Sequence, residues 1–411
     1  MNTVAAPEMA PIPSHVPTEL IWDHPEIKTF ARQLADPYDI VAPLHAGPDI
    51  IWARGAAYGE PGWILTRHDP IQDAFLDPAT FTSTETYEVG PLLGVDWRQV
   101  PLELDPPDHR AYRMVLQPWF NPNAINRLET FIRDTANELI ERFEARGQCE
   151  FFSEFSCLFP SYIFLHLMGM PRENLDEFLG WTHGFMRSTD MSVRIASIRK
   201  IRDYLESYIA KRRQEAPRDD LVDTILTAQV DGKPLTHNEV MGMCIMLYLG
   251  GLDTVVSSLG WYMRYLATHP NLQERLRANP GDIPAAVADF LRAHGVVMTR
   301  RKVTRDVEFH GVKMLKGDWV VLPTQLAGRD DRIYTEPERV DPDREQRHLT
   351  LGKGVHNCLG AHLAGREIKI VLEEFLARFS SIRIAKGAEI KFDIEGVWAV
   401  TQLPLSLQKA K

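Results

Sequence analysis

Cys358 lies in a glycine-rich loop that leads directly into a predicted helix. The segment 351–363 reads LGKGVHNCLGAHL, and three glycines surround the cysteine: Gly352, Gly354 and Gly360. Glycine permits backbone angles and close approaches that a side chain would forbid, so the loop can lie against a flat, bulky group. The helix predicted from Leu359 to Phe375 directs its free amides and positive dipole end at the sulfur, which favours the thiolate. Such a thiolate can be a nucleophile or a metal ligand.

Simpler explanations exist for both features of this loop. A lone cysteine can be a small buried apolar residue. A glycine-rich loop can hold phosphate, but no Gly-Lys-Ser/Thr ending follows, and Cys358 stands where that lysine would be needed. A nucleophilic cysteine needs a base, for which His356 and His362 are candidates. A cysteine hydrolase without a cofactor is therefore one alternative.

The longest predicted helix carries a second unusual feature at its midpoint. Thr236 and Glu239 form a capping box, and His269 followed by proline is a stop signal, so one helix roughly 50 Å long is predicted between them. Gly250 and Gly251 interrupt it and cost about 1–2 kcal/mol relative to alanine. Either this is a plain kink, or something must lie against the backbone here.

Together the two segments resemble the cytochrome P450 monooxygenases. The family's haem-thiolate signature is Phe-x-x-Gly-x-x-x-Cys-x-Gly, and Leu351 replaces its phenylalanine here. The run Gly-Gly-x-Asp-Thr at 250–254 resembles the family's oxygen-activation segment. The resemblance implies haem b with Cys358 as the ligand of the iron, an arrangement that favours O–O cleavage.

The resemblance also implies roles for individual residues. Gly250 and Gly251 would make room for dioxygen, Thr254 would hydrogen-bond the bound oxygen, and Asp253 would feed protons inward. An Asp-Pro-Pro-x-His-x-x-x-Arg run resembles the start of the helix that contacts the haem propionates. The haem contacts implied in this chain are Leu351, Gly352, His356, Cys358, Gly360, His109, Arg113 and Arg301.

Asp289 and Arg292 resemble the family's Glu-x-x-Arg pair, with aspartate replacing glutamate. Asp289 is one methylene shorter, so its bonds to Arg292 and to the later Arg339 must be rebuilt or bridged by water. We expect this to affect folding and haem retention rather than the reaction. Without the other motifs, a surface helix ion pair worth a few tenths of a kcal/mol would explain the two residues.

Within the family, the chain resembles the bacterial camphor 5-monooxygenase group. Trp97 stands where that group fixes its substrate with a tyrosine, and an indole can donate only one hydrogen bond. The remaining pocket residues implied by the resemblance are mainly apolar: Tyr87, Met186, Met246, Leu249, Val296, Val297 and Val397. Such a pocket suits a compact terpenoid or norisoprenoid.

The resemblance implies a redox partner as well. A 2Fe-2S ferredoxin with its ferredoxin reductase would supply electrons and dock near Cys358, where Arg110, Arg113 and Lys353 offer positive charge. Two alternatives share the haem site: a haem-binding sensor or carrier, and a peroxide-driven peroxygenase of the same fold.

Composition excludes several other classes. The chain has 411 residues, a formal net charge of −10 and an isoelectric point near 5.8, and no basic stretch that would favour nucleic acid. Its four cysteines show no paired spacing, which indicates a reducing compartment. There is no signal segment and no run of about eighteen apolar residues, so we predict a cytoplasmic monomer without a membrane anchor.

The predicted fold class is mainly α with small β-sheets: the cytochrome P450 fold, a triangular prism with haem between a long central helix and the helix after Cys358. Prolines make residues 1–20 an extended or disordered arm, and residues 21–411 a single domain. The other predicted segments are a hairpin at 49–67, a long aromatic loop at 81–104, helices at 125–146 and 194–213, a break at 180–191 and short strands at 296–323.

Overall fold

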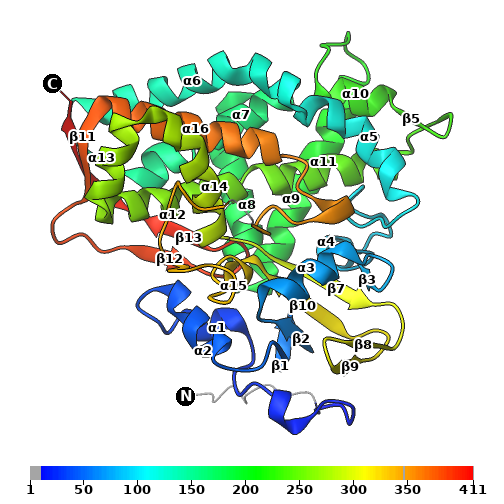
Figure 1. Ribbon diagram of the computed structural model, residues 1–411. Coiled ribbons are helices and arrows are strands. Elements are labelled where there is room, and N and C mark those ends of the chain that lie inside the picture. Colours follow the sequence, from blue (N-terminus) through cyan, green and yellow to red (C-terminus); the bar gives the residue numbers. More distant parts are fainter. Residues whose placement is uncertain (1–10, 346–347, 411) are drawn as a thin grey trace, which may run out of the picture.

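The computed structural model describes residues 11–345 and 348–410. It is helix-rich, with 51% of the chain helical, which confirms the predicted fold class. Figure 1 shows most helices gathered in one half of the molecule, while the largest sheet lies in the other half with the first two helices.

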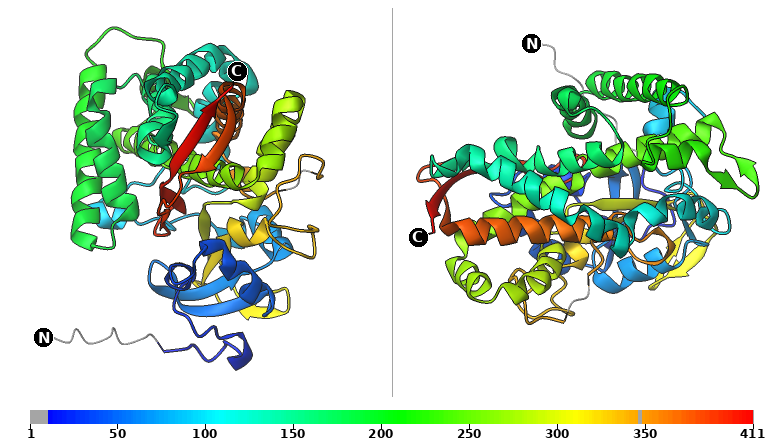
Figure 2. Two further views of the ribbon diagram at one scale, coloured as in Figure 1. Left: turned by 90° about the vertical axis from the view of Figure 1, so that its left-hand side faces the viewer. Right: turned by 90° about the horizontal axis from the view of Figure 1, so that it is seen from above.

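The longer helices build most of the helical half. They are α5 (His109–Phe120), α6 (Pro122–Glu144), α8 (Leu175–Arg187), α9 (Met191–Arg212), α11 (His237–Gly251), α12 (Thr254–Thr268), α14 (Ile283–Ala293) and α16 (Ala361–Arg378). The shorter helices are α1 (Ile27–Ala31), α2 (Val41–His45), α3 (His68–Leu76), α4 (Val89–Leu93), α7 (Phe159–Leu167), α10 (Leu221–Thr227), α13 (Pro270–Ala278) and α15 (Thr324–Ala327). The helix that follows Cys358, α16, lies alongside α6 (Figures 1 and 2).

The largest sheet has the strand order β1-β2-β10-β7-β3. Its members are β1 (Ile50–Ala57), β2 (Glu60–Leu65), β3 (Phe81–Thr82), β7 (Met298–Val303) and β10 (Trp319–Pro323). The smaller sheets contain β4 (Gln148–Glu150), β5 (Gln229–Val230), β6 (Lys233–Pro234), β8 (Val307–Phe309), β9 (Val312–Met314), β11 (Phe379–Ile384), β12 (Lys391–Asp393), β13 (Ala399–Gln402) and β14 (Pro404–Lys409). The predicted hairpin at 49–67 and the predicted strands at 296–323 are therefore confirmed.

The predicted central helix is two helices in line. The Thr236–Glu239 capping box is present and begins α11. The helix is interrupted at Leu252 and Asp253, after which α12 starts. The stretch from His237 to Thr268 has the length and composition of a membrane span, but 67% of its most apolar window is buried inside the protein, as expected for a core helix.

Three predicted segments need correction. The predicted arm at 1–20 is packed from residue 11 onward: Val16 is buried, and Nε2 of His15 lies 3.0 Å from a carboxylate oxygen of Asp318. The first ten residues lie outside the described part. The predicted loop at 81–104 contains β3 and α4, in which Phe81, Val89 and Leu93 are buried.

The predicted break at 180–191 is mostly the helix α8. Only residues 188–190 connect α8 to α9, and Asp190 caps α9 through the amide of Ser192 (2.8 Å). Gly184 does not break the helix; a Cβ there would lie 2.2 Å from the hydroxyl of Ser197. The glycine lets α8 and α9 approach closely.

Asp289 and Arg292 form a fully buried ion pair. The alternative explanation, an ion pair on a helix surface, is therefore wrong. Arg292 also donates to the carbonyls of Gly328 (2.7 Å) and Pro337 (2.6 Å), and to that of Arg339 (2.8 Å). The predicted bond between Asp289 and the Arg339 side chain is wrong. Because the Arg339 carbonyl faces inward, its guanidinium lies outside and pairs with carboxylates at the surface.

Arg344 takes the place predicted for Arg339. Its Nε lies 3.3 Å from Asp289, and its side chain is largely buried. Asp289 also accepts a hydrogen bond from the amide of Asp341 (2.6 Å). The shorter carboxylate is thus satisfied without a side chain from position 339.

The Asp289 network makes a prediction about stability. Asp289→Ala leaves Arg292 buried without a carboxylate, so the free energy of unfolding should fall by roughly 3–5 kcal/mol. Arg344→Ala should cost about 2 kcal/mol, and Arg339→Ala less than about 1 kcal/mol. Urea unfolding of the three variants measures these losses. A larger loss for Arg339→Ala than for Arg344→Ala would contradict the assignment.

Candidate active site

The Cys358 loop is shaped by its glycines. Gly352 and Gly354 both have φ of 70°, a conformation that disfavours other residues, and a Cβ on Gly354 would lie 3.0 Å from the carbonyl of Phe75. The amide of Cys358 donates to the carbonyl of Leu351 (2.7 Å), which closes the loop just before α16. The backbone therefore fixes the cysteine independently of any partner.

The electrostatics of the thiol differ from the sequence prediction. Burial raises the pKa of Cys358 above its ordinary value; the amide of Gly360 and the charge of Arg113 oppose this but do not overcome it. The residue as a whole is nevertheless exposed. A thiol in these surroundings is a poor free nucleophile, whereas a bound metal ion would deprotonate it outright.

The two glycines of the central helix face different surroundings. A Cβ on Gly250 would meet nothing within 4 Å, so the helix is open to a ligand there. A Cβ on Gly251 would lie 2.3 Å from the ring of Phe164 on α7. Gly251 therefore allows the central helix to pack against α7, although the sequence predicted that both glycines make room for dioxygen. Thr254 follows one turn after Gly250, and its hydroxyl donates to the Gly250 carbonyl (2.9 Å).

Asp253 lies at the interruption of the central helix and is fully buried. It forms an ion pair with Arg187 on α8, whose Nη2 is also 3.2 Å from the hydroxyl of Ser257. The second oxygen of Asp253 has no hydrogen-bond partner among the described residues. Arg187 was not predicted from the sequence, because it lies in the segment 180–191 that was predicted to be a break. The only indication of a role was that it is a single basic residue in an apolar stretch.

The predicted basic residues do come together. His109 and Arg113 lie on the first turns of α5, and the ring of His109 is 4.6 Å from that of His356 in the Cys358 loop. Nη2 of Arg113 donates to the carbonyl of Asn357 (2.7 Å), next to the cysteine. Arg301 on β7 is only 4% exposed.

Asp105 is the carboxylate closest to this cluster. Burial alone would raise its pKa, but hydrogen bonds from His356 and Thr82 lower the pKa of Asp105 to about 2. Burial, His356 and Arg113 lower the pKa of His109 to about 4, so its ring is neutral near neutral pH. Asp105 acts on Arg301 at longer range, while the charge near Arg113 is that of Cys358.

Haem fits this arrangement. A buried guanidinium requires an anionic or hydrogen-bonded partner, yet within the described ranges the only hydrogen bond of Arg301 is to the carbonyl of Arg300 (2.7 Å), and it has no ion pair. The hydroxyl of Thr299 is buried and without a partner. Haem propionates would satisfy these groups, while Cys358 would ligate the iron and Gly250 would leave room on the other face.

The predicted pocket residues are partly brought together. The amide of Trp398 donates to the carbonyl of Val296 (3.0 Å), and a Cβ on Gly396 would lie 2.6 Å from the carbonyl of Met186. Val397, between those two hairpin residues, is buried. This places Met186, Val296 and Val397 next to one another, while Met246, Leu249 and Val297 are partly buried at the edges of the apolar cores.

The two aromatic pocket residues have different surroundings. Trp97 lines an open cleft of about 480 Å³ between the segment 96–104, α5 and the start of α11. Tyr87 lies close to Arg301: burial raises the pKa of its hydroxyl, and the arginine opposes that rise.

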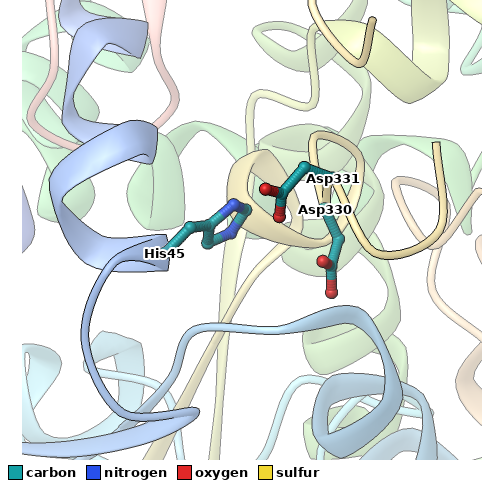
Figure 3. Close-up of side chains that lie close together, drawn as sticks. All are labelled: His45, Asp330 and Asp331. Carbon is teal, nitrogen blue, oxygen red and sulfur yellow. The ribbon is translucent and has the colours of Figure 1, made fainter. Parts of the chain in front are cut away.

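A second cluster of metal-ligand type does not need a metal. His45, Asp330 and Asp331 lie close together (Figure 3), with one possible ligand atom of each within 4.8 Å of the others. However, Nη1 of Arg67 lies 2.7 Å from Asp330 and 2.5 Å from Asp331. A guanidinium therefore already pairs with both carboxylates.

Comparison with known proteins agrees with the site. The cytochrome P450 family model matches residues 181–280 and 283–408. The probable cytochrome P450 127A1 of Sinorhizobium fredii is 34% identical, over 92% of this chain and 92% of its own. The crystal structures of CYP101J2 and CYP101C1 each give a TM-score of 0.84, at 30% and 31% identity, and cover 97% and 96% of this chain and 100% and 99% of theirs.

The chain therefore belongs to the cytochrome P450 family. It is a monooxygenase whose cofactor is haem b bound through a cysteine thiolate, and it uses dioxygen and a redox partner as the family does. The predicted resemblance to the camphor 5-monooxygenase group is confirmed by the two CYP101 structures.

The haem fit leads to a prediction about Arg301. Replacing Arg301 with Met removes the buried cation that would hold a propionate, so haem should dissociate roughly ten- to a hundredfold faster. The rate is measured by transfer of haem to an excess of apomyoglobin. Arg300→Met is the matched control, because Arg300 instead stacks 3.7 Å over the ring of Tyr58. Equal effects of the two substitutions would contradict the role of Arg301.

Proposed function

We propose that this enzyme hydroxylates a compact apolar cyclic substrate of terpenoid or norisoprenoid type, with electrons from a 2Fe-2S ferredoxin. One observation best supports a compact substrate. The tip of the terminal hairpin β12–β13 packs directly onto α8 at Gly396 and Met186. The side chains of Met186, Val296 and Val397 are proposed to form one apolar wall of the pocket. A wall closed by backbone contact leaves little room for a large substrate.

Tyr87 is the group proposed to orient the substrate. Burial raises the pKa of its hydroxyl, so it stays protonated and can donate a hydrogen bond to a ketone or ether oxygen. The indole of Trp97, which faces the outer cleft, is better placed to line an entrance than to fix the bound molecule.

Proton delivery is proposed to run through Asp253 and Thr254. When bound, haem supplies the oxygen-activating chemistry, and the protein supplies the protons. The unpartnered oxygen of Asp253 can take up a proton, while Arg187 holds the other oxygen. The hydroxyl of Thr254 donates to the carbonyl of Gly250 and can still accept, so it can hold a water molecule beside the open face of the helix.

The ferredoxin is proposed to dock on the surface around the Cys358 loop. Arg110 and Lys353 are exposed there, on α5 and in the loop. Met114 on α5 and Val355 in the loop are exposed apolar side chains, and Leu76 at the end of α3 is a third, next to Gly354 of the loop. An apolar centre with a basic rim suits an acidic partner protein. The cytoplasmic location and monomeric state predicted from the sequence are part of this proposal.

The substrate proposal is tested by the haem spin state. Compact cyclic terpenoids and norisoprenoids should displace the water on the iron and shift the spectrum, whereas macrolide-sized molecules should not. Val397→Phe should weaken the best ligand roughly tenfold or more by filling the pocket. Val355→Phe, on the proposed docking surface, should leave ligand affinity unchanged. Tight binding of macrolides alone would contradict the proposed substrate class.

The docking surface makes its own prediction. Arg110→Glu and Lys353→Glu should each slow reduction by a 2Fe-2S ferredoxin roughly tenfold at low salt and less at high salt, because the interaction is electrostatic. Lys200→Glu is the control, since Lys200 is exposed on α9, which packs on α8 and α11. Stopped-flow kinetics measures the rate. A uniform effect of all three changes would indicate net charge rather than a docking site.

A further inference from the structure

Arg187 lies between two carboxylates that come from distant parts of the chain. Its Nη2 pairs with Asp253, and its Nη1 lies 4.0 Å from Oδ1 of Asp393 on β12. The side chains of Asp253, Arg187 and Asp393 are 0%, 8% and 22% exposed. The three groups form a row from the interior toward the surface.

Arg187 is not saturated by these contacts. Its Nε and Nη1 are buried and make no hydrogen bond within the described ranges, and one oxygen of Asp253 is also unpartnered. A guanidinium has five N–H donors in a planar fork, so one group can serve two carboxylates and move between them. The 4.0 Å distance leaves Asp393 as the looser of the two partners.

The other groups near Arg187 carry no compensating charge. Burial and Arg187 lower the pKa of His183, which is therefore neutral. Burial raises the pKa of Cys157, so that thiol is protonated. Ser257 and the ring of Phe152 complete the surroundings. The charge of Arg187 is thus balanced by Asp253 and Asp393.

The terminal hairpin holds Asp393 in place. Phe392 stacks on Trp261 of α12 at 5.1 Å, and the indole of Trp261 donates to the carbonyl of Trp398 (2.9 Å). At the tip, the amide of Glu395 donates to Oδ1 of Asp393 (3.0 Å). The hairpin is therefore fixed against the same helix that follows Asp253.

Asp393 also connects the interior pair with charges at the surface. The carboxylate of Glu395 pairs with Arg32 and lies 3.5 Å from Nζ of Lys28, both near α1. Arg32 acts on Asp393 at longer range. The row thus runs from the active site to solvent at the α1 side of the molecule.

We propose that Asp393 is a positioning residue for proton delivery at Asp253: it shares Arg187 with Asp253, so that Asp253 can exchange its proton. This inference rests on the proposed role of Asp253. Without the charge of Asp393, Arg187 binds Asp253 alone and holds its carboxylate in place. With it, the proton that Asp253 gives up inward is replaced by one from solvent.

The pH dependence of the row has a definite sign. Burial and Asp253 raise the pKa of Asp393, and Arg187 and Arg32 oppose the rise without overcoming it. As the pH falls through this raised pKa, Asp393 becomes neutral and stops attracting Arg187. Glu395, Lys28 and His183 are the remaining ionisable groups nearby. Wild-type enzyme at acidic pH should therefore behave like Asp393→Asn.

The first test compares Asp393→Asn with Glu395→Gln, which removes a neighbouring carboxylate that does not face Arg187. At neutral pH, Asp393→Asn should lower the product formed per electron pair roughly three- to tenfold and raise the solvent isotope effect on turnover. In the pH range where the product yield of the wild type changes, the yield of Asp393→Asn should stay constant. Glu395→Gln should match the wild type. The same loss in both variants, or none in Asp393→Asn, would overturn the proposal.

The second test does not depend on activity. Thermal unfolding of Asp253→Asn, Asp393→Asn and the double variant forms a double-mutant cycle. Because the double variant leaves Arg187 buried with no anion, its melting temperature should fall by more than the sum of the single losses. Additive losses would show that the carboxylates do not share Arg187. If the cycle shows coupling but Asp253→Asn turns over normally, the proposed role of Asp253 fails and the shared arginine stands.

Discussion

Buried positive charge is the constraint on which the active-site half of this molecule depends. A guanidinium removed from water is stable only beside anions or several carbonyl groups. Arg292 is satisfied by Asp289 and three carbonyls, while Arg187 lies between two carboxylates. Within the described ranges Arg301 has one carbonyl and no ion pair, and a haem propionate would supply the missing anion. Arg292 thereby fixes α14 to the segment before the Cys358 loop, and Arg187 fixes α8 to α12 and the terminal hairpin.

The interrupted central helix is what makes the second of these arrangements possible. Asp253 has φ of −133° and leaves the helical ladder, which allows its carboxylate to reach Arg187 on α8. On the neighbouring turn, Gly251 admits Phe164, while Gly250 faces open space. Neighbouring residues at the interruption therefore have different roles. Gly251 packs against α7, Gly250 exposes the backbone to a ligand, and Asp253 provides a buried acid.

Turns and helix caps, which depend on residues close in the sequence, could be predicted from the sequence. Contacts between side chains that are distant in the sequence could not. The Cys358 loop and the capping box at Thr236 follow from positive φ angles and side-chain oxygens within a few residues. The segment 180–191 was wrongly predicted to be a break, because the sequence does not show that Gly184 admits a neighbouring helix instead of ending its own. Likewise, nothing in the sequence distinguishes Arg344 from Arg339 as the partner of Asp289, since the choice depends on which way the chain turns. The thiol pKa was also misjudged, because desolvation by the whole fold outweighs the amide of Gly360.

The terminal hairpin links two tasks that the rest of the fold keeps apart. Val397 at its tip is proposed to contact the substrate, and Asp393 on its first strand faces Arg187. Only three residues separate them, and the hairpin that carries both contacts α8 and α12. A substrate that displaced the tip would necessarily move Asp393 relative to Arg187, because a hairpin this short cannot bend independently at its two ends. Substrate shape and proton supply are then coupled by one rigid element, so a change that enlarges the pocket at Val397 cannot leave the charge balance around Asp253 untouched.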